Sequence, residues 1–252
     1  MSITRAVHIN IVALKYFCSR MSTNDTVREY VLSRIDEETL DKWKLGYAPG
    51  TGGLVEALDK DGIHRDESES MGLIKTDSSG KCREVFYRRV VFPICYAGKL
   101  VAFAGRVVDG AGKQAKYINT KTTSVYDKKN VLYGLWTNRK SISERGRVLL
   151  VEGYFDILGL YSKGIRNVAC IGGTSITESH ILNLRRYTNE VGIVTDGDSA
   201  GEKSAKEIRK ILAKNSVSSF IVNLPAGYDP DTYLDKVGID NFNELVEKSR
   251  GE

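Results

Sequence analysis

Short apolar runs alternate with amphipathic stretches through the second half of the chain. The runs are rich in β-branched and aliphatic residues, which is typical of strands buried on both faces. They occupy residues 147–153, 167–171, 190–195 and 218–224. Helical spacing is found at 155–163, 177–187, 199–214 and 231–237. This alternation predicts βαβ crossovers, and therefore an α/β domain with a mainly parallel sheet flanked by helices.

The first half of the chain has a different rhythm. Apolar residues at helical spacing predict helices within residues 5–44, one of them capped by Asn24 or Asp25. Residues 45–50 interrupt the helical pattern, and a short helix is expected after them at 53–60. Strands are predicted at 86–94, 99–108 and 116–119, with a turn at 97–98 and a loop at 109–112. We therefore expect a mixed α+β subdomain over residues 1–145 and the parallel-sheet domain over 146–252.

Composition narrows the class of protein. With 252 residues, 41% of them hydrophobic, the chain can bury a core in each of two domains. No apolar run approaches the ~20 residues needed to span a bilayer, and the first residues lack the pattern of a signal peptide. The four cysteines are scattered and form no zinc-ligand spacing. We expect a cytoplasmic protein without a zinc site.

Positive charge is concentrated before the parallel-sheet domain. Residues 1–146 contain 24 Lys and Arg against 17 Asp and Glu, whereas 147–252 contain 13 against 15. Residues 81–145 alone have 14 basic against 4 acidic residues, a net charge of +10. Such a segment predicts contact with a polyanion.

Carboxylates gather where the predicted parallel strands end. One such residue after a strand is commonly a helix cap, but this chain places several at one edge of the sheet, where ligands bind. Their mutual repulsion favours bound cations, and hard oxygen ligands select Mg²⁺ or Mn²⁺. The candidate metal ligands are Glu152, Asp156, Asp196, Asp198, Asp229 and Asp231.

These carboxylates lie within motifs that resemble a known family. EGYFD, GGTSIT, DGDSAGEKSA and DPD follow one another from residue 152 to 231, in the order found in Toprim domains. Upstream, WKLGYAPG, RRVVFPI, FAGR, KYINT and LYGL extend the likeness. From about Leu14 to its end, the chain resembles the catalytic core of DnaG-type bacterial primases.

The resemblance implies a role for each group of residues. Glu152 would be the catalytic glutamate, acting as general acid/base or as a metal ligand, and the aspartates would share two or three Mg²⁺ or Mn²⁺ ions. Residues implied in nucleotide and DNA binding are Arg89, Arg106, Lys116, Tyr117 and Asn119. The sequence departs from the family pattern at Tyr87, Ala104 and Ala115, where the family has Arg, Gly and Pro.

The function implied is template-dependent synthesis of short RNA primers on single-stranded DNA from nucleoside triphosphates. The sequence shows neither the zinc module nor the helicase-docking domain of the family. We therefore expect a replicative helicase and a separate zinc-binding protein as partners, in the cytoplasm of bacteria, with a cellular, phage or plasmid gene. The alternatives are a Toprim-type metal-dependent nuclease and an inactive single-strand-binding component of a primosome.

Overall fold

The chain folds into two compact units, Met1–Lys128 and Lys129–Glu252. The computed structural model describes residues 1–108, 114–173 and 175–251, so the loop predicted at 109–112 lies outside the described residues. A short 3-10 helix, Lys128–Asn130, spans the junction of the units. The helix before the parallel sheet, α6, belongs to the second unit, and the predicted domain limit at residue 145 falls at its C-terminal end.

The first unit is built on an antiparallel sheet with the order β1-β4-β5-β6. Its strands are β1 (Gly46–Ala48), β4 (Arg89–Tyr96), β5 (Lys99–Val107) and β6 (Tyr117–Asn119). The last three confirm the predicted strands within a few residues at each end. The predicted break in the helical pattern at 45–50 is confirmed, since α3 ends at Trp43, and the short strand β1 that lies there was not predicted because its pairing with β4 is long-range.

Helix α1 (Ile3–Ser22) packs across this sheet. Phe17 meets Phe103 and Phe86 edge-on, with ring centroids 5.4 and 6.3 Å apart. Gly46 leaves the space for this contact, because a Cβ there would lie 2.4 Å from Cβ of Phe17. The helices α2 (Asp25–Leu32) and α3 (Glu37–Trp43) follow. The predicted cap is confirmed: the Asn24 side chain accepts the backbone N–H of Val27 at 3.0 Å.

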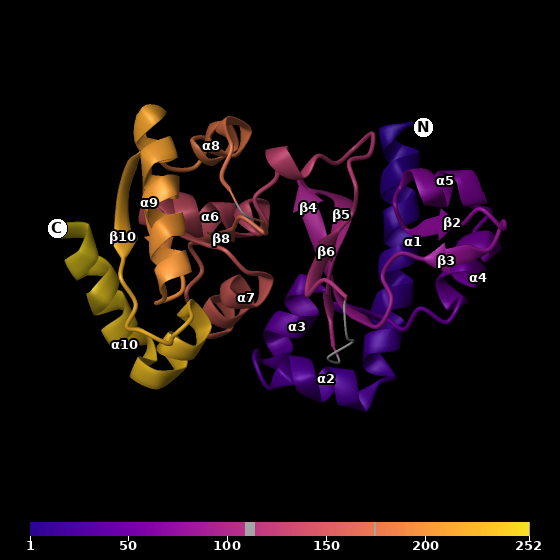
Figure 1. Ribbon diagram of the computed structural model, residues 1–252, viewed down its shortest axis with the longest axis horizontal. Coiled ribbons are helices and arrows are strands. Elements are labelled where there is room, and N and C mark those ends of the chain that lie inside the picture. The colour runs from indigo at the N-terminus through magenta and orange to yellow at the C-terminus, as the bar shows by residue number, and fades with distance from the viewer. Residues whose placement is uncertain (109–113, 174, 252) are drawn as a thin grey trace. The chain divides into compact units, whose positions relative to one another are not determined.

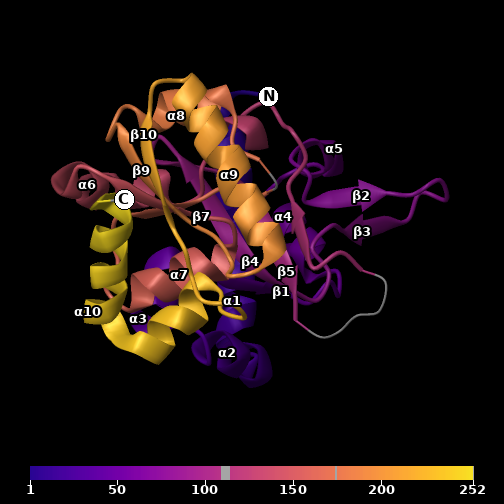
Figure 2. The ribbon, with the colours of Figure 1, turned by 60° about the vertical axis from the view of Figure 1, so that its left-hand side comes forward.

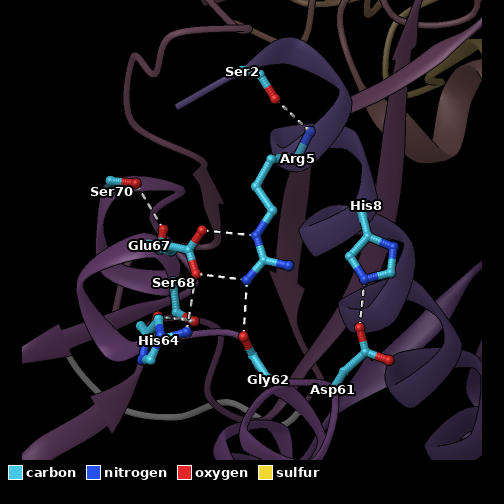
Figure 3. Close-up of polar contacts among 9 residues, drawn as sticks. All are labelled: Ser2, Arg5, His8, Asp61, Gly62, His64, Glu67, Ser68 and Ser70. Carbon is cyan, nitrogen blue, oxygen red and sulfur yellow. Dashed lines mark hydrogen bonds and ion pairs between the residues drawn. The ribbon is translucent and has the colours of Figure 1, made fainter.

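A polar cluster ties the start of α1 to the segment after α4 (Gly53–Lys60), as Figure 3 shows. The Arg5 guanidinium donates to both carboxylate oxygens of Glu67, each at 2.7 Å, and to the carbonyl of Gly62 at 2.9 Å. Beside it, His8 contacts the carboxylate of Asp61. Glu67 belongs to the short helix α5 (Arg65–Ser70), so the cluster fixes that helix against α1.

A two-stranded hairpin follows α5 and extends away from the four-stranded sheet in Figures 1 and 2. Its strands are β2 (Ile74–Thr76) and β3 (Cys82–Glu84). Buried Leu73 and Ile74 anchor its base in the core beneath α1. The sequence does not predict this hairpin, because its strands are too short to show a period.

The second unit is built on a parallel sheet with the order β10-β9-β7-β8. Its strands are β7 (Val148–Val151), β8 (Val168–Cys170), β9 (Glu190–Val194) and β10 (Ser218–Val222). Each lies inside a predicted apolar run. The expected fold class is confirmed: an α+β unit is followed by a domain with a parallel sheet between helices.

Helices cover both faces of this sheet. One face packs on α6 (Leu135–Arg145), α8 (Glu178–Leu184) and α9 (Ser199–Lys214) through a core that includes Val148, Leu150, Val191 and Ile193. The opposite face lies under α7 (Tyr154–Ser162) and α10 (Pro230–Gly251), and Figure 1 shows α9 and α10 on either side of β10. The helix predicted at 231–237 continues to 251 after a break in helical geometry at Gly238.

Among the residues that the structure describes, no helix combines the length and the apolar character needed to cross a membrane.

Candidate functional site

The order of the strands places the acidic residues at a switch point of the parallel sheet. From β7 the chain passes to β8 on one side, and it later returns to β9 and β10 on the other. Parallel sheets bind ligands where the strand order reverses in this way, beyond the carboxyl ends of the strands. Glu152 directly follows β7 and Asp196 follows β9, so both border this point.

The backbone of Glu152 is fixed by the neighbouring strand. Its carbonyl accepts the N–H of Gly172 at 3.2 Å and the thiol of Cys170 at 3.1 Å. Its side-chain oxygen Oε1 is buried and has no hydrogen-bond partner in the described part of the chain. A buried carboxylate oxygen without a hydrogen-bond partner is energetically costly, and a bound cation would relieve that cost.

The segment Asp196-Gly197-Asp198 leads from β9 into α9. The Asp198 carboxylate caps α9 by accepting the N–H of Gly201 at 2.7 Å through its oxygen Oδ1. Gly197 must lack a side chain, because a Cβ there would lie 2.1 Å from the carbonyl oxygen of Pro225.

The loop after β10 is bonded to this segment. The N–H of Gly197 donates to the carbonyl of Tyr228 at 2.8 Å, and the N–H of Gly227 donates back to Gly197 at 3.3 Å. Asp229 follows immediately and accepts the N–H and the hydroxyl of Thr232 at 2.8 and 2.7 Å, which holds it at the start of α10. The two loops thus bring Asp229 to the same edge of the sheet as Asp196.

The pKa of Asp156 reflects the negative charge gathered at this edge of the sheet. Its carboxylate accepts the N–H of Gly153 at 2.9 Å in the first turn of α7. Its pKa is nevertheless raised to about 7, first because the carboxyl is buried and next because Asp196 and Asp229 place negative charge near it. Asp156, Asp196 and Asp229 therefore influence one another electrostatically at this edge of the sheet, and Glu152 directly precedes Gly153, the backbone partner of Asp156.

Asp231 has different surroundings from the other carboxylates. It is 4% exposed, and its carboxylate lies 2.6 Å from the ammonium nitrogen of Lys163. Burial raises its pKa, and the hydrogen bond from Lys163 opposes this shift. Gly159 makes room for it, since a Cβ there would lie 1.8 Å from the Asp231 oxygen. Asp231 thus has a cation of its own, between α7 and α10.

Carboxylate oxygens are suitable ligands for hard divalent cations such as Mg²⁺. In the described part of the chain no three His, Cys, Asp or Glu side chains come close enough to enclose a metal ion. Mg²⁺ does not require such a cage, because it usually keeps several waters and binds through one or two carboxylates together with substrate phosphates. The unpartnered oxygen of Glu152 and the accumulated charge around Asp156 suit that open kind of site.

The predicted basic residues lie in the first unit, and Arg89 is buried there. It is 3% exposed, and its guanidinium donates to the carbonyls of Gly105, Lys116 and Ala115 at 3.0 to 3.3 Å. Burial lowers its pKa. Arg89 therefore joins β5 to the backbone that precedes β6, which is a structural role rather than the predicted contact with a substrate.

Arg106, Tyr117 and Asn119 share the sheet face opposite α1. Arg106 and Tyr117 are directly paired across β5 and β6, and the guanidinium carbon lies 5.6 Å from the Tyr117 ring centroid and 5.7 Å from that of Tyr30. Asn119 lies two residues further along β6, so it points to the same side. All three are partly exposed, and the Lys116 side chain beside them is exposed.

Three residues of these sites were missed by the sequence analysis. Lys163 partners Asp231, Tyr30 stacks on Arg106, and Cys170 bonds the backbone of Glu152. No local signal identifies them, because each acts across elements that only the fold brings together.

Family models match both halves of the chain. Residues 16–139 match the DNA primase catalytic core, N-terminal domain, and residues 149–234 match the Toprim-like family. A DNA primase of Aquifex aeolicus is 37% identical over 237 residues, which are 93% of this chain and 47% of that protein. The chain spans about half the length of this relative, and 35% of the DNA primase of Chlamydia muridarum, which is 34% identical.

Solved structures agree with the sequence matches. The zinc-binding and RNA polymerase domains of Aquifex aeolicus primase align with a TM-score of 0.93 at 34% identity, over 99% of this chain and 62% of that one. The RNA polymerase domain of Mycobacterium tuberculosis primase DnaG aligns with a TM-score of 0.89 at 28% identity, over 98% and 84%. The predicted family is thereby confirmed, and the chain belongs to the catalytic cores of DnaG-type DNA primases.

Proposed function

We propose that this chain catalyses template-dependent synthesis of short RNA primers on single-stranded DNA. The observation that carries the proposal is the carboxylate cluster at the switch point, where the buried oxygen of Glu152 has no partner among the described residues and the pKa of Asp156 is raised to about 7. The named relatives are DNA primases, and solved catalytic domains similar to this chain include one bound to single-stranded DNA and one in complex with double-stranded DNA.

Each acidic residue has a proposed part. Glu152 is the catalytic glutamate, and Asp156, Asp196, Asp198 and Asp229 hold two or three Mg²⁺ or Mn²⁺ ions. Ions bound there would lower the pKa of the attacking 3′-hydroxyl and neutralise charge on the phosphoryl oxygens. We assign Asp231 a positioning role instead, because Lys163 already neutralises it.

The basic residues bind the nucleic acid and the incoming nucleotide in this proposal. Arg106 faces the triphosphate, Tyr117 stacks on a template base and Lys116 binds a phosphate of the template strand. Asn119 hydrogen-bonds to the strand from the same face. Arg89 acts indirectly, since its buried guanidinium holds the backbone from which Lys116 and Tyr117 extend.

The partners are proposals as well. A replicative helicase would deliver the core to the fork, and a separate zinc-binding protein would recognise the template sequence, because contacts with phosphates alone carry no sequence information. The bacterial relatives favour a protein of the bacterial cytoplasm.

The experiment is primer synthesis by the purified chain with single-stranded DNA, labelled ribonucleotides, and Mg²⁺ or Mn²⁺. Glu152→Gln and Asp198→Asn should each lower synthesis by several orders of magnitude while the thermal unfolding temperature stays near that of the parent. The matched control is Glu244→Gln, which removes an exposed carboxylate of α10. Near-normal synthesis by Glu152→Gln, or degradation of the DNA in place of synthesis, would contradict the proposal.

A further inference from the structure

The hairpin formed by β2 and β3 has two like charges directly opposite each other. Lys75 pairs with Arg83 across the antiparallel strands. Such pairs have their Cβ atoms about 4.5 to 5.5 Å apart, and like charges there destabilise the pairing. Both side chains are exposed, and Lys81 at the end of the turn is exposed as well. A two-stranded hairpin is marginally stable by itself, so this repulsion destabilises an element whose own stability is already small.

The carboxylates of the same region do not neutralise these cations well. Asp77 closes the turn, because it accepts the N–H groups of Ser79 and Lys81 at 3.0 and 3.1 Å and the Ser79 hydroxyl at 2.6 Å. Its other oxygen lies 3.5 Å from Arg83, whose side chain is still 69% exposed.

Two further carboxylates bind backbone groups. Glu69 accepts the N–H and the hydroxyl of Thr76 at 3.2 and 3.3 Å, and Glu84 accepts the N–H of Leu54 at 2.8 Å. The acidic side chains are thus used to build the hairpin and its base. The lysine ammonium groups form no ion pair among the residues that the structure describes, which leaves a positive outer face.

The alternation of side chains along the strands gives the hairpin one side that packs on the domain and one side that bears the cations. Ile74 and Glu84 form one cross-strand pair and Thr76 with Cys82 another, on the side opposite to Lys75 and Arg83. Ile74 is buried and Cys82 packs against the core beneath α1. Since that side holds the hairpin on the domain, the side with Lys75 and Arg83 is available to a partner.

We propose that Lys75, Lys81 and Arg83 bind the phosphate backbone of DNA at a contact of their own on the hairpin, separate from the sheet face that bears Arg106 and Tyr117. The inference rests on the proposed function, which supplies the polyanion. Three separated cations on a protruding element suit a flexible phosphodiester strand, and such contacts are independent of sequence. The hairpin extends away from the sheet that bears Arg106 and Tyr117, so a strand bound at that sheet must continue further to reach it (Figures 1 and 2).

The test compares two variants with the same change in charge. The hairpin variant combines Lys75→Gln, Lys81→Gln and Arg83→Gln, and the control combines Lys210→Gln, Lys214→Gln and Lys248→Gln on exposed positions of α9 and α10. Affinity for single-stranded DNA is measured by fluorescence anisotropy as salt is raised from about 50 to 200 mM. One strand has about 8 nucleotides, the size of a compact binding site, and the other is roughly four times longer.

We expect the hairpin variant to bind the long strand more weakly, with a log-log salt slope flatter by roughly 2, since each lost phosphate contact removes about 0.7. The ratio of the parent's affinity for the long strand to that of the hairpin variant should fall roughly 15- to 20-fold over that salt range. The short strand should show little difference, and the control should match the parent. At saturating DNA the rate of dinucleotide synthesis should be unchanged, because the hairpin has no part in the chemistry.

Equal binding of the long strand by the hairpin variant and the control would overturn the inference, while synthesis by the parent would leave the proposed function standing. A parent that neither binds DNA nor makes primers would overturn both. The single variant Lys81→Gln, in the turn, keeps the measurement meaningful if the triple variant unfolds. It should flatten the slope by roughly 0.7.

Discussion

The ammonium nitrogen of Lys163, the C-cap residue of α7, lies 2.6 Å from a carboxylate oxygen of Asp231 in α10, and 3.0 Å from Asp235 one turn further along. This ion pair joins the helix that follows Glu152 to the helix that follows Asp229. It therefore couples the position of α10 to that of the sheet edge where Glu152 lies.

Replacing Lys163 by Met should destabilise the protein by roughly 3 kcal/mol, because it leaves a buried carboxylate without its cation. Denaturant unfolding measures this difference. The control is Lys140→Met, which breaks an exposed pair with Glu144 at 3.8 Å and should cost no more than about 0.5 kcal/mol. Equal effects of the two variants would show that the Lys163 pair is no more important than a surface contact.

Asp231→Asn separates a positioning role from metal binding. If positioning dominates, the variant should keep synthesis within about tenfold of the parent under conditions where it is folded. A loss as large as that of Glu152→Gln, in a folded variant, would make Asp231 a ligand after all.

Gly159→Ala should destabilise the second unit, although alanine is the better helix former by about 1 kcal/mol. The new Cβ would lie 1.8 Å from the carboxylate oxygen of Asp231 and would displace it from Lys163. Thermal unfolding of Gly159→Ala is compared with that of Gly251→Ala, where a Cβ meets nothing within 4 Å. A more stable Gly159→Ala variant would contradict the packing described.

The raised pKa of Asp156 predicts a pH dependence of stability in metal-free buffer. A carboxyl with an ordinary pKa of 3.8 that titrates near 7 in the folded protein stabilises the fold below pH 4. That contribution is lost as the pH rises towards 7. Asp156→Asn should therefore be more stable than the parent at pH 8, by on the order of 1 to 4 kcal/mol, and equal to it near pH 3. Unfolding curves across this range test the sign, and a parent that is the more stable at pH 8 would refute it.

Arg89 and Arg106 should respond differently to substitution. Arg89→Met removes the donors to the carbonyls of residues 105, 115 and 116, and should lower stability by a few kcal/mol. Arg106→Ala should leave stability within about 1 kcal/mol and raise the KM for nucleotide, because its guanidinium is partly exposed beside Tyr117. The opposite pattern would exchange the two roles.

Local pattern predicted the parallel sheet well. Strands such as Glu190–Val194 are mainly apolar runs followed closely by a carboxylate, here Asp196, and Asn24 is a cap whose side chain acts within three residues. Apolar runs and helix caps depend on residues that are close in the sequence, so the sequence alone reveals them. The acidic residues could therefore be assigned to one edge of the sheet from the order of strands and carboxylates along the chain.

Long-range contacts could not be predicted in the same way. Nothing near Arg89 in the sequence reveals that it is buried beneath residues 114–116, and nothing near Lys163 indicates Asp231, which lies 68 residues away. Strands of three residues such as β1 and β2 are also too short to display a period. Such features depend on which surfaces the completed fold brings together.

The hydrogen bonds between Gly197 and the loop at 227–228 have a consequence for engineering this protein. Because the two loops share a backbone interface, with Gly197 against the carbonyl of Pro225, neither can be exchanged alone without shifting the other. A chimera with a related protein should transplant residues 196–201 together with 224–229. The same contacts imply that, among related proteins, substitutions in one loop are tolerated only when the other loop carries substitutions that accommodate them.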